Sequence, residues 1–343
     1  MNASKFYDEE LERERSLDRP SSIVYPHRNA FFPPDPLETP CLSQPSSLPR
    51  QARIYPPPGL VNLGATCNVN AILNCLFFLP ELWKTIPLSL SDTPVLKDLR
   101  TILIALNSSK CSVKPKKFVD SLESHIASVK SNGTPAPKRK LFSFKRQHDG
   151  FEVLGYILEE MKRAYQNPDL LSIGISKLPT CLACMHDQNV EVVSDPSLTV
   201  PFANSIVKFI RKYYGEQVNR RCWHCKTNQD CSITMTFTDL PKILVLHVNR
   251  SNYDKDKREH IKINAQINCN KVISLPLGSN GPIVEYRLSS VIHHTGTPDS
   301  GHYTATLCDP ATKRMWHCND TNITPTANVN QATAGILFYK KVE

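Results

Sequence analysis

Cys67 is the residue of this sequence whose setting best suits nucleophilic chemistry. The segment 59–67 (GLVNLGATC) precedes an apolar stretch, which places Cys67 at the start of a predicted buried helix. There the helix dipole and unpaired backbone N–H groups favour a thiolate. Gly64 lets the backbone pass close to whatever Cys67 attacks, and the amide of Asn62 could face a developing oxyanion. Because most buried cysteines are inert, this segment needs a partner base to become a catalytic candidate.

His302 is the candidate base, although the sequence holds eleven histidines and any one of them could be structural. It lies at the predicted start of a strand, between Gly301, which leaves room for substrate, and Tyr303. The stretch 316–320 (WHCND) comes fifteen residues later, after a predicted strand, so that Asn319 or Asp320 could hold the far nitrogen of the imidazole ring.

Two CxxC pairs predict a metal site in the middle of the chain. The pairs are separated by 37 residues, and each directs two thiolates at one ion. Four sulfur ligands suit a tetrahedral structural Zn²⁺ with no open position for catalysis. The predicted ligands are Cys181, Cys184, Cys222 and Cys225, and His186, His224 and Cys231 lie near enough to substitute for one of them.

The elements that must position these residues are helical in the first half of the chain and β-rich in the second. Apolar residues recur at helical spacing up to residue 165, and short apolar runs follow beyond about Cys181. This order predicts an α+β fold. The predicted helices are 70–82, 93–106, 118–129 and 149–165, and the predicted strands are 243–248, 283–292, 303–307 and 336–339.

Composition limits the classes of protein to which the chain can belong. With 343 residues the chain can form about two domains, or one large domain with extensions. It contains no run of eighteen apolar residues and no apolar segment at its N-terminus, so we expect neither a transmembrane helix nor a secretory signal. The twelve cysteines are therefore expected to be thiols and metal ligands rather than a disulfide framework.

The first 58 residues differ from the rest of the chain. They hold eleven of the 27 prolines and carry a net charge of −1, which leaves +10 for the remainder. We interpret residues 1–58 as a largely disordered or loosely docked leader, either a solvated segment or a partner-binding arm. The basic end of 131–140 is interpreted as a solvated linker, although a nuclear signal is an alternative interpretation.

Taken together, these segments resemble the ubiquitin-specific protease family, which consists of papain-like cysteine proteases with a thumb, a palm and fingers. The first box of the family, GLxNLGxTCxxNxxLQ, is similar to residues 59–74 (GLVNLGATCNVNAILN). Its QxDxxE box is similar to 147–152 (QHDGFE), and its histidine box to 294–305 (HTGTPDSGHYTA). The two CxxC pairs match the zinc site of the fingers. The resemblance covers about 59–341, with the boxes in family order.

The resemblance implies one catalytic domain over 59–343, with fingers at about 175–240, and a role for each boxed residue. It implies an enzyme that hydrolyses the isopeptide bond at the C-terminal glycine of ubiquitin, with structural Zn²⁺ and no organic cofactor. It assigns Cys67 as the nucleophile, His302 as the general base and Asn319 as the residue that orients His302. Asp320 aligns with a position on which some members rely. Asn62 aligns with the amide that stabilises the oxyanion. It also implies that Asp149 and Glu152 bind the basic tail of ubiquitin, with Gly301 and Tyr303 beside it.

Several positions depart from the family pattern without removing a catalytic group. Asn68 follows the nucleophile where an aromatic residue is usual, Ala71 replaces a common serine, and Asn74 stands in place of glutamine. The strand that usually ends in Arg-Phe reads Arg250-Ser251. Because of these departures, an enzyme that removes a ubiquitin-like modifier instead of ubiquitin is an alternative interpretation.

Two other classes of protein are alternatives to a deubiquitinase. A catalytically weak ubiquitin-binding scaffold is disfavoured by the complete set of Cys67, His302 and Asn319. A zinc-ribbon nucleic-acid module is disfavoured because the positive charge is not gathered into one stripe. We therefore expect ubiquitin or a related modifier as the partner, and neither nucleic acid nor membrane.

Thiol chemistry also predicts the compartment. Without a signal peptide we expect a cytoplasmic or nuclear protein, where the sequons that begin at Asn319 and Asn322 stay unglycosylated. Among the remaining cysteines, Cys318 lies beside Asn319 and is expected to be the one most open to oxidation.

Overall fold

The computed structural model describes most of the chain from residue 56 onward. The described residues are 56–86, 93–131, 142–165, 168–202, 216–254, 258–298, 300–309 and 312–342. They fall within the compact unit Ser43–Glu343. Nearly all of the predicted leader 1–58 and of the linker 131–140 lies outside the described residues, so the boundary predicted near residue 58 stays a prediction.

The helices of the first half form where apolar periodicity predicts them, with one break. They are α2 (Cys67–Phe77), α3 (Pro80–Lys84), α4 (Pro94–Ser108), α5 (Lys116–Ser131) and α6 (Gly150–Ala164), with a 3-10 turn at Pro168–Leu170. The single helix predicted over 70–82 is wrong, because Pro80 has no N–H to continue α2 and instead begins α3 at its first turn.

Helix α6 shows why the second box begins where it does. Asp149 is the N-cap residue, and its side chain accepts a hydrogen bond from the backbone N–H of Glu152 at 2.8 Å. Val153, Leu154 and Ile157 are among the residues that it buries in the core it shares with α2. The start of α6 is therefore fixed beside the end of the loop that carries Gln147.

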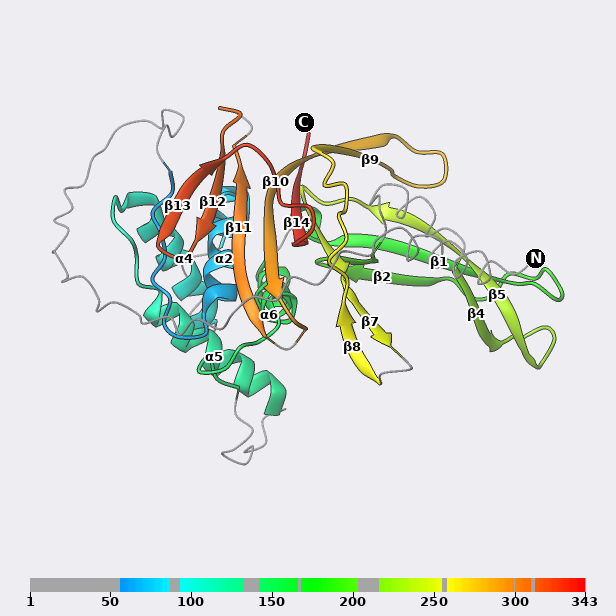
Figure 1. Ribbon diagram of the computed structural model, residues 1–343. Coiled ribbons are helices and arrows are strands. Elements are labelled where there is room, and N and C mark those ends of the chain that lie inside the picture. Colours follow the sequence, from blue (N-terminus) through cyan, green and yellow to red (C-terminus); the bar gives the residue numbers. More distant parts are fainter. Residues whose placement is uncertain are drawn as a thin grey trace, which may run out of the picture. The chain divides into compact units, whose positions relative to one another are not determined.

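An eight-stranded sheet forms the centre of the second half (Figure 1). Its order is β13-β12-β11-β10-β14-β6-β3, with β9 also paired to β10. All pairs are antiparallel except β3 and β6. The stretch 316–320 follows the strand β11, as predicted, and most of it forms the next strand, β12. The strands are β3 (Leu198–Pro201), β6 (Ile243–Asn249), β9 (Val272–Pro276), β10 (Ile283–Gly296), β11 (Gly301–Cys308), β12 (Met315–Asn319), β13 (Asn322–Thr326) and β14 (Ala334–Lys341).

The two inner strands β6 and β14 are covered on both faces. Ile243 and Val245 of β6 belong to the core formed with the helices, whereas Leu244, Leu246 and Val248 belong to a second core on the opposite face. The same alternation runs along β14. Because both faces are buried, β6 has the near-continuous apolar sequence ILVLHV rather than an alternating one.

A separate four-stranded sheet, here called the fingers sheet, extends away from the helices in Figure 1. Its order is β2-β1-β5-β4, and its base contributes Ile173, Ile175, Met235 and Phe237 to the second core. Its strands begin earlier than the predicted onset of β structure near Cys181. The bounds are β1 (Ile173–Cys181), β2 (Glu191–Asp195), β4 (Glu216–Arg221) and β5 (Asn228–Asp239), and a small hairpin pairs β7 (Ser251–Asp254) with β8 (Glu259–Lys262).

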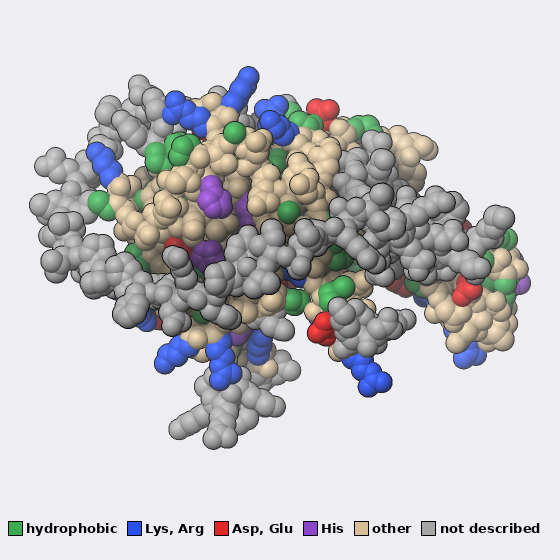
Figure 2. Space-filling model, in the orientation of Figure 1, with side chains coloured by type: hydrophobic (Ala, Val, Ile, Leu, Met, Phe, Trp, Pro, Cys, Tyr) green, Lys and Arg blue, Asp and Glu red, His purple; other side chains and the backbone are tan. Residues whose placement is uncertain are grey.

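Two of the predicted absences concern the surface and the membrane. Among the described residues, no helix is both long enough and apolar enough to span a bilayer. On the face drawn in Figure 2, the described Lys and Arg side chains are scattered along the edges and do not gather into one stripe. That distribution gives no support to nucleic-acid binding on this face.

Candidate active site and metal centre

Cys67 is the first residue of α2 and is 5% exposed. Burial raises the pKa of its thiol above the ordinary value, and the charge of Asp320 adds to this. Backbone N–H groups of Tyr303, Asn68 and Cys67 itself act in the opposite direction, without reversing the net shift. The N–H groups at the helix start therefore favour the thiolate as expected, but desolvation outweighs them and the net shift of the pKa is upward. In the free protein this cysteine needs a base.

His302 and Asn319 are held together by neighbouring strands. Ala305 of β11 lies opposite Cys318 of β12, so Asn319 lies diagonally across from His302 on the same face. The Oδ1 atom of Asn319 is 2.7 Å from Nε2 of His302. Since an amide oxygen only accepts, Nε2 carries the proton and the neutral ring keeps its lone pair on Nδ1. The sequence left Asn319 and Asp320 open for this contact, and the structure places Asn319 there.

Asp320 instead connects the strand that carries Asn319 to the segment that carries Cys67. Its Oδ2 atom accepts from Nδ2 of Asn62 at 2.9 Å, and Oδ1 accepts from Nδ2 of Asn70 at 2.7 Å. Its backbone oxygen accepts from the N–H of Leu60 at 2.9 Å. It adopts a left-handed conformation with φ of 51° that brings both its backbone and its side chain to this segment.

The backbone at Gly59 also lies very close to the backbone at Thr321, the residue after Asp320. A Cβ atom on Gly59 would lie 2.5 Å from the backbone oxygen of Thr321, so only glycine fits there. This approach of the two segments therefore explains the glycine that opens the first box.

Asn62 organises the turn before the nucleophile. Its Oδ1 atom accepts from the backbone N–H groups of Gly64 (3.0 Å) and Thr66 (3.3 Å) and from the Thr66 hydroxyl (3.1 Å). Gly64 has a φ of 124°, a conformation that other residues rarely adopt. One hydrogen of Asn62 Nδ2 is used by Asp320, and Nδ2 carries a second hydrogen.

Gln147 is a residue whose role the sequence did not reveal. Its Nε2 atom donates to the backbone oxygen of Gly301 at 2.9 Å, and its Oε1 atom accepts from the N–H of Gly301 at 2.8 Å. A two-point bond of this kind fixes the residue just before His302 relative to the loop before α6. The QxDxxE pattern contained the signal, but its spacing does not show which distant residue Gln147 contacts.

The structure brings three of the four predicted substrate-binding residues together. Gly301, Tyr303 and Asp149 line one cavity of about 240 Å³, with Gln147 and His294 also in its wall. The Tyr303 hydroxyl accepts from the N–H of Gly150 at 2.9 Å and is 3.4 Å from Asp149 Oδ2.

Glu152 is not part of that cavity. Its carboxylate is paired with Lys130 at 2.8 Å, and it lines a different depression together with His125 and Tyr156. Of the two acidic residues predicted to bind substrate, only Asp149 therefore lies beside Gly301 and Tyr303.

Lys262 is a second residue that the sequence did not reveal. Its Nζ atom donates to the backbone oxygens of His294 (2.7 Å) and Gly296 (3.3 Å) and lies 3.0 Å from His294 Nδ1. His294 stacks on Tyr303 with ring centroids 4.4 Å apart. Burial, followed by the charge of Lys262, lowers the pKa of His294 to about 4. Lys262 thus fixes the end of β10 next to the turn that leads to His302, and no local pattern marks it.

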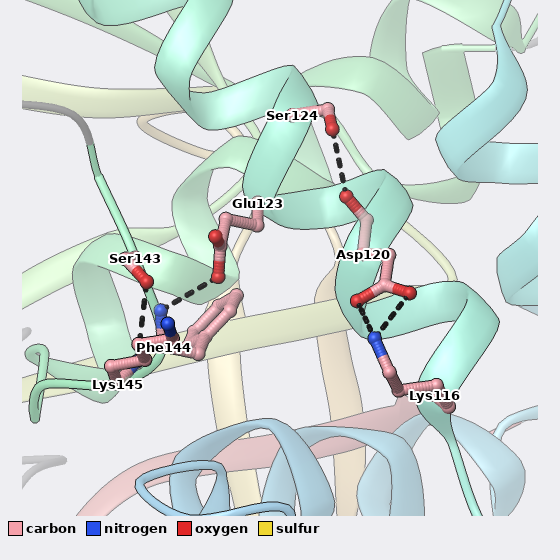
Figure 3. A network of polar contacts seen from close by, with 7 residues as sticks. All are labelled: Lys116, Asp120, Glu123, Ser124, Ser143, Phe144 and Lys145. Carbon is pink, nitrogen blue, oxygen red and sulfur yellow. Dashed lines mark hydrogen bonds and ion pairs between the residues drawn. The ribbon is translucent and has the colours of Figure 1, made fainter. Parts of the chain in front are cut away.

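Helix α5 supports the other side of the nucleophile loop (Figure 3). The Glu123 carboxylate points at the segment 143–145 and accepts from the N–H of Phe144 at 2.8 Å. The carbonyl of Phe144 in turn accepts from the N–H of Ala65 at 3.3 Å. A chain of contacts therefore runs from α5 to the residue two positions before Cys67.

One departure from the family pattern, Asn68, is explained by its contacts, and so is Arg250, which the pattern keeps. Asn68 is 1% exposed and donates from Nδ2 to the backbone oxygen of His148 at 3.0 Å. Arg250 is 7% exposed and donates to the carbonyls of Ala334, Ile263, Ala265 and Gln331 at 2.7–2.9 Å. Both residues therefore fix backbone segments.

Cys318 corrects the expectation about oxidation. It is 1% exposed in the helix-side core, and burial raises the pKa of its thiol far above the ordinary value. A buried, protonated thiol is a poor target for oxidants.

The four predicted metal ligands meet at the end of the fingers sheet. The Sγ atoms of Cys181, Cys184, Cys222 and Cys225 all lie within 4.8 Å of one another. The N–H of Cys225 and the side-chain amide of Gln188 point at Sγ of Cys222, each at 3.4 Å. The N–H of Cys225 is the main cause that lowers the pKa of Cys222 to about 6. Four convergent sulfurs, one of them with donors directed at it, fit a soft or borderline divalent ion.

The three residues that could replace one of the predicted zinc ligands differ in their position. Cys231 is buried and is not one of the four convergent sulfurs, and its Sγ contacts the backbone oxygen of Gln229. His186 and His224 lie close to Cys184 and form a second group with it.

Comparison with known proteins shows which proteins this chain is similar to. Residues 58–339 match the family model described as ubiquitin carboxyl-terminal hydrolase. The chain is 26% identical to ubiquitin carboxyl-terminal hydrolase 25 of Arabidopsis thaliana over 87% of its length, and 23% identical to ubiquitin carboxyl-terminal hydrolase Usp2 of Drosophila melanogaster over 82%. It spans 49% of the first relative and 34% of the second.

A solved structure shares the fold. The structure of the SAGA Ubp8/Sgf11/Sus1/Sgf73 DUB module bound to ubiquitin aldehyde superposes with a TM-score of 0.63 at 18% identity, covering 83% of this chain and 70% of that one. The predicted α+β fold, with a helical half, a β-rich half and a fingers sheet that carries the four cysteines, is confirmed at this level.

Proposed function

The chain belongs to the ubiquitin carboxyl-terminal hydrolase family, and from that premise we propose that it is a thiol-dependent deubiquitinase. The observation that carries the proposal is the meeting of three elements at one point. His302 at the start of β11 is bonded to Asn319 of β12, and the N–H of Tyr303, the next residue along β11, points at the Cys67 sulfur. A nucleophile, a base and an orienting amide therefore lie together.

The proposed reaction uses the ring nitrogen of His302 that Asn319 does not hold and the amide hydrogen of Asn62 that Asp320 does not hold. Because Asn319 holds the proton on Nε2, Nδ1 of His302 can take the proton of Cys67 as its sulfur attacks the carbonyl carbon of the C-terminal glycine. The second Nδ2 hydrogen of Asn62 stabilises the oxyanion. His302 then gives its proton to the leaving lysine amine, and water, activated by the same ring, hydrolyses the thioester.

Recognition of the modifier's tail is assigned to the cavity beside this site. Gly301 lines this cavity and cannot carry a side chain, since a Cβ atom would lie 2.3 Å from both the His294 ring and the Thr295 oxygen. Asp149 supplies the carboxylate for a basic side chain of the tail. Glu152 would have to leave Lys130 to contribute, so its role is expected to be the smaller.

We also propose that the four-cysteine group holds structural Zn²⁺. The residues that would hold it are Cys181, Cys184, Cys222 and Cys225. When bound, the ion joins the turn after β1 to the turn after β4, and with four sulfur ligands it leaves no position for substrate.

A ubiquitin-like modifier is the second candidate substrate, and one observation favours it. Ser251, where the family usually has phenylalanine, lines a cavity of about 310 Å³ together with Asp149, His294 and Tyr303. A small hydroxyl there offers a different surface from an aromatic ring.

The test is covalent trapping of the full chain with ubiquitin that carries a C-terminal vinyl electrophile, in parallel with probes built on ubiquitin-like modifiers. We expect the ubiquitin probe to label wild type and to fail with Cys67→Ala, and His302→Ala to label slowly. Faster labelling by another modifier's probe would replace ubiquitin as the substrate. Measurable ubiquitin affinity without any labelling or hydrolysis would overturn the enzymatic proposal and leave a binding scaffold.

A further inference from the structure

The end of the fingers sheet holds a second group of metal-ligand atoms that the structural zinc does not use. Sγ of Cys184 and one ring nitrogen each of His186 and His224 lie within 4.8 Å of one another. Both histidines are exposed, whereas Cys184 is half-buried between them and the other three cysteines. Cys184 therefore belongs to both groups.

His186 has one ring nitrogen free to bind an ion once its exposed ring turns out of the stack with His224. Its Nδ1 atom lies 2.9 Å from the backbone oxygen of Cys184. A carbonyl can only accept, so Nδ1 carries the proton and the lone pair is on Nε2. This is the arrangement that metal-bound histidines usually have, with the second ring nitrogen bonded to a carbonyl.

The two imidazoles and a tryptophan form one aromatic cluster. The rings of His186 and His224 stack with centroids 3.8 Å apart and an angle of 14°. Trp223 meets both rings edge-on, at 6.1 Å from His186 and 5.9 Å from His224. Its own Nε1 is bonded to the Asp187 oxygen at 3.0 Å, so the indole is fixed beside the pair.

The chemistry of a filled four-cysteine centre favours a second ion at this place. Four thiolates carry more negative charge than one divalent ion neutralises, and a zinc-bound thiolate keeps lone pairs with which it can bridge to another metal. One sulfur and two imidazoles suit zinc and related borderline ions. Three protein ligands leave a position for water, which is typical of an open site rather than a closed structural one.

We propose that Cys184, His186 and His224 form a second, exchangeable site for a zinc-class divalent ion, bridged through the Cys184 sulfur to the structural centre. The proposal rests on the proposed occupancy of the four cysteines by zinc. The second ion binds more weakly than the first because it has fewer protein ligands and both histidines are exposed to water.

Zinc stoichiometry tests the proposal on the full chain. After equilibrium dialysis against excess Zn²⁺, wild type should hold two ions, and one after a mild chelator. The double variant His186→Ala/His224→Ala should hold one ion in both conditions. His260→Ala removes an exposed histidine of β8 and is the matched control, which should keep two.

Fluorescence gives an independent readout that does not depend on activity. Co²⁺ added to the one-zinc protein should quench Trp223, and this quenching should be absent in the double histidine variant and in Trp223→Phe. A wild type that holds one zinc under all conditions, or a double variant that still takes up two, would overturn the second site alone. A protein that holds no tight zinc would instead overturn the structural centre proposed above.

Discussion

The bond between Asp320 and Asn62 should decide how well the oxyanion is stabilised. Removing an oxyanion-hole donor typically slows catalysis by about 10²- to 10³-fold, and we expect Asn62→Ala to do so through kcat. Asp320→Ala leaves Asn62 in place but removes the carboxylate that holds its Nδ2 atom at 2.9 Å. Hydrogen bonds to charged groups contribute about 1.5–3 kcal/mol, so this variant should lose about 10- to 150-fold in kcat.

A double-mutant cycle tests whether Asp320 acts through Asn62. If it does, the double variant should be no slower than Asn62→Ala, because the coupling energy equals the whole effect of Asp320→Ala. Asn70→Ala, which removes the other side-chain partner of Asp320, is the matched control and should slow kcat less. The assay is hydrolysis of a fluorogenic ubiquitin amide, with urea unfolding to check that each variant is folded.

The rate of Cys67 alkylation should increase in Asp320→Ala, whereas kcat should decrease. The negative charge of Asp320 is one of the causes that raise the pKa of Cys67. Asp320→Ala should therefore lower that pKa, increase the thiolate fraction at pH 7.5 and speed the reaction with iodoacetamide while hydrolysis slows. If the effects of the two substitutions on kcat multiply in the double variant, or if alkylation slows together with hydrolysis, the reasoning is refuted.

Three further perturbations follow from contacts described above. Gln147→Ala removes both hydrogen bonds to Gly301. At roughly 1 kcal/mol per hydrogen bond, it should reduce kcat/KM by about 10-fold or more in the same assay. An unchanged kcat/KM would show that these two bonds do not position His302. Burial lowers the pKa of His293 to about 4, below its unfolded value of 6.5, so unfolding takes up a proton and stability falls as pH drops from 6.5 towards 4. This residue should remove about 2 kcal/mol of the free energy of unfolding between pH 7 and pH 5, and urea titrations of His293→Gln should show a weaker dependence by that amount. Chelation, or Cys222→Ser, should make the fingers sheet sensitive to limited proteolysis while the helices stay protected; equal sensitivity in both parts would argue against a local zinc centre.

The sequence was informative where a residue's role depends on its immediate neighbours. Cys67 at a helix start, His302 at a strand start and the paired cysteines could all be placed because turn and strand signals surround them. The break at Pro80 was missed, although proline at a first helical turn is a common helix start.

The remaining features depend on contacts between residues far apart in the chain. Asp320 and Asn62 are separated by 258 positions, and Gln147 and Gly301 by 154. The direction of the Cys67 pKa depends on how deeply the packed fold buries it, which periodicity does not reveal. Lys262 lies in a polar strand without any motif, so only its three contacts identify it as a positioning residue.

The alternation along β6 and β14 limits how this chain can change in length. Each strand sends successive side chains into two different cores. Inserting or deleting one residue would exchange the cores for every side chain beyond that point, and Ile336 and Phe338 would trade places with Leu337 and Tyr339. Changes in length within these two strands should therefore be tolerated only in steps of two residues, whereas loops outside the strands are not restricted in this way. In an alignment of related domains, we therefore expect gaps within β6 and β14 to be an even number of residues long, and gaps outside the sheet to be of any length.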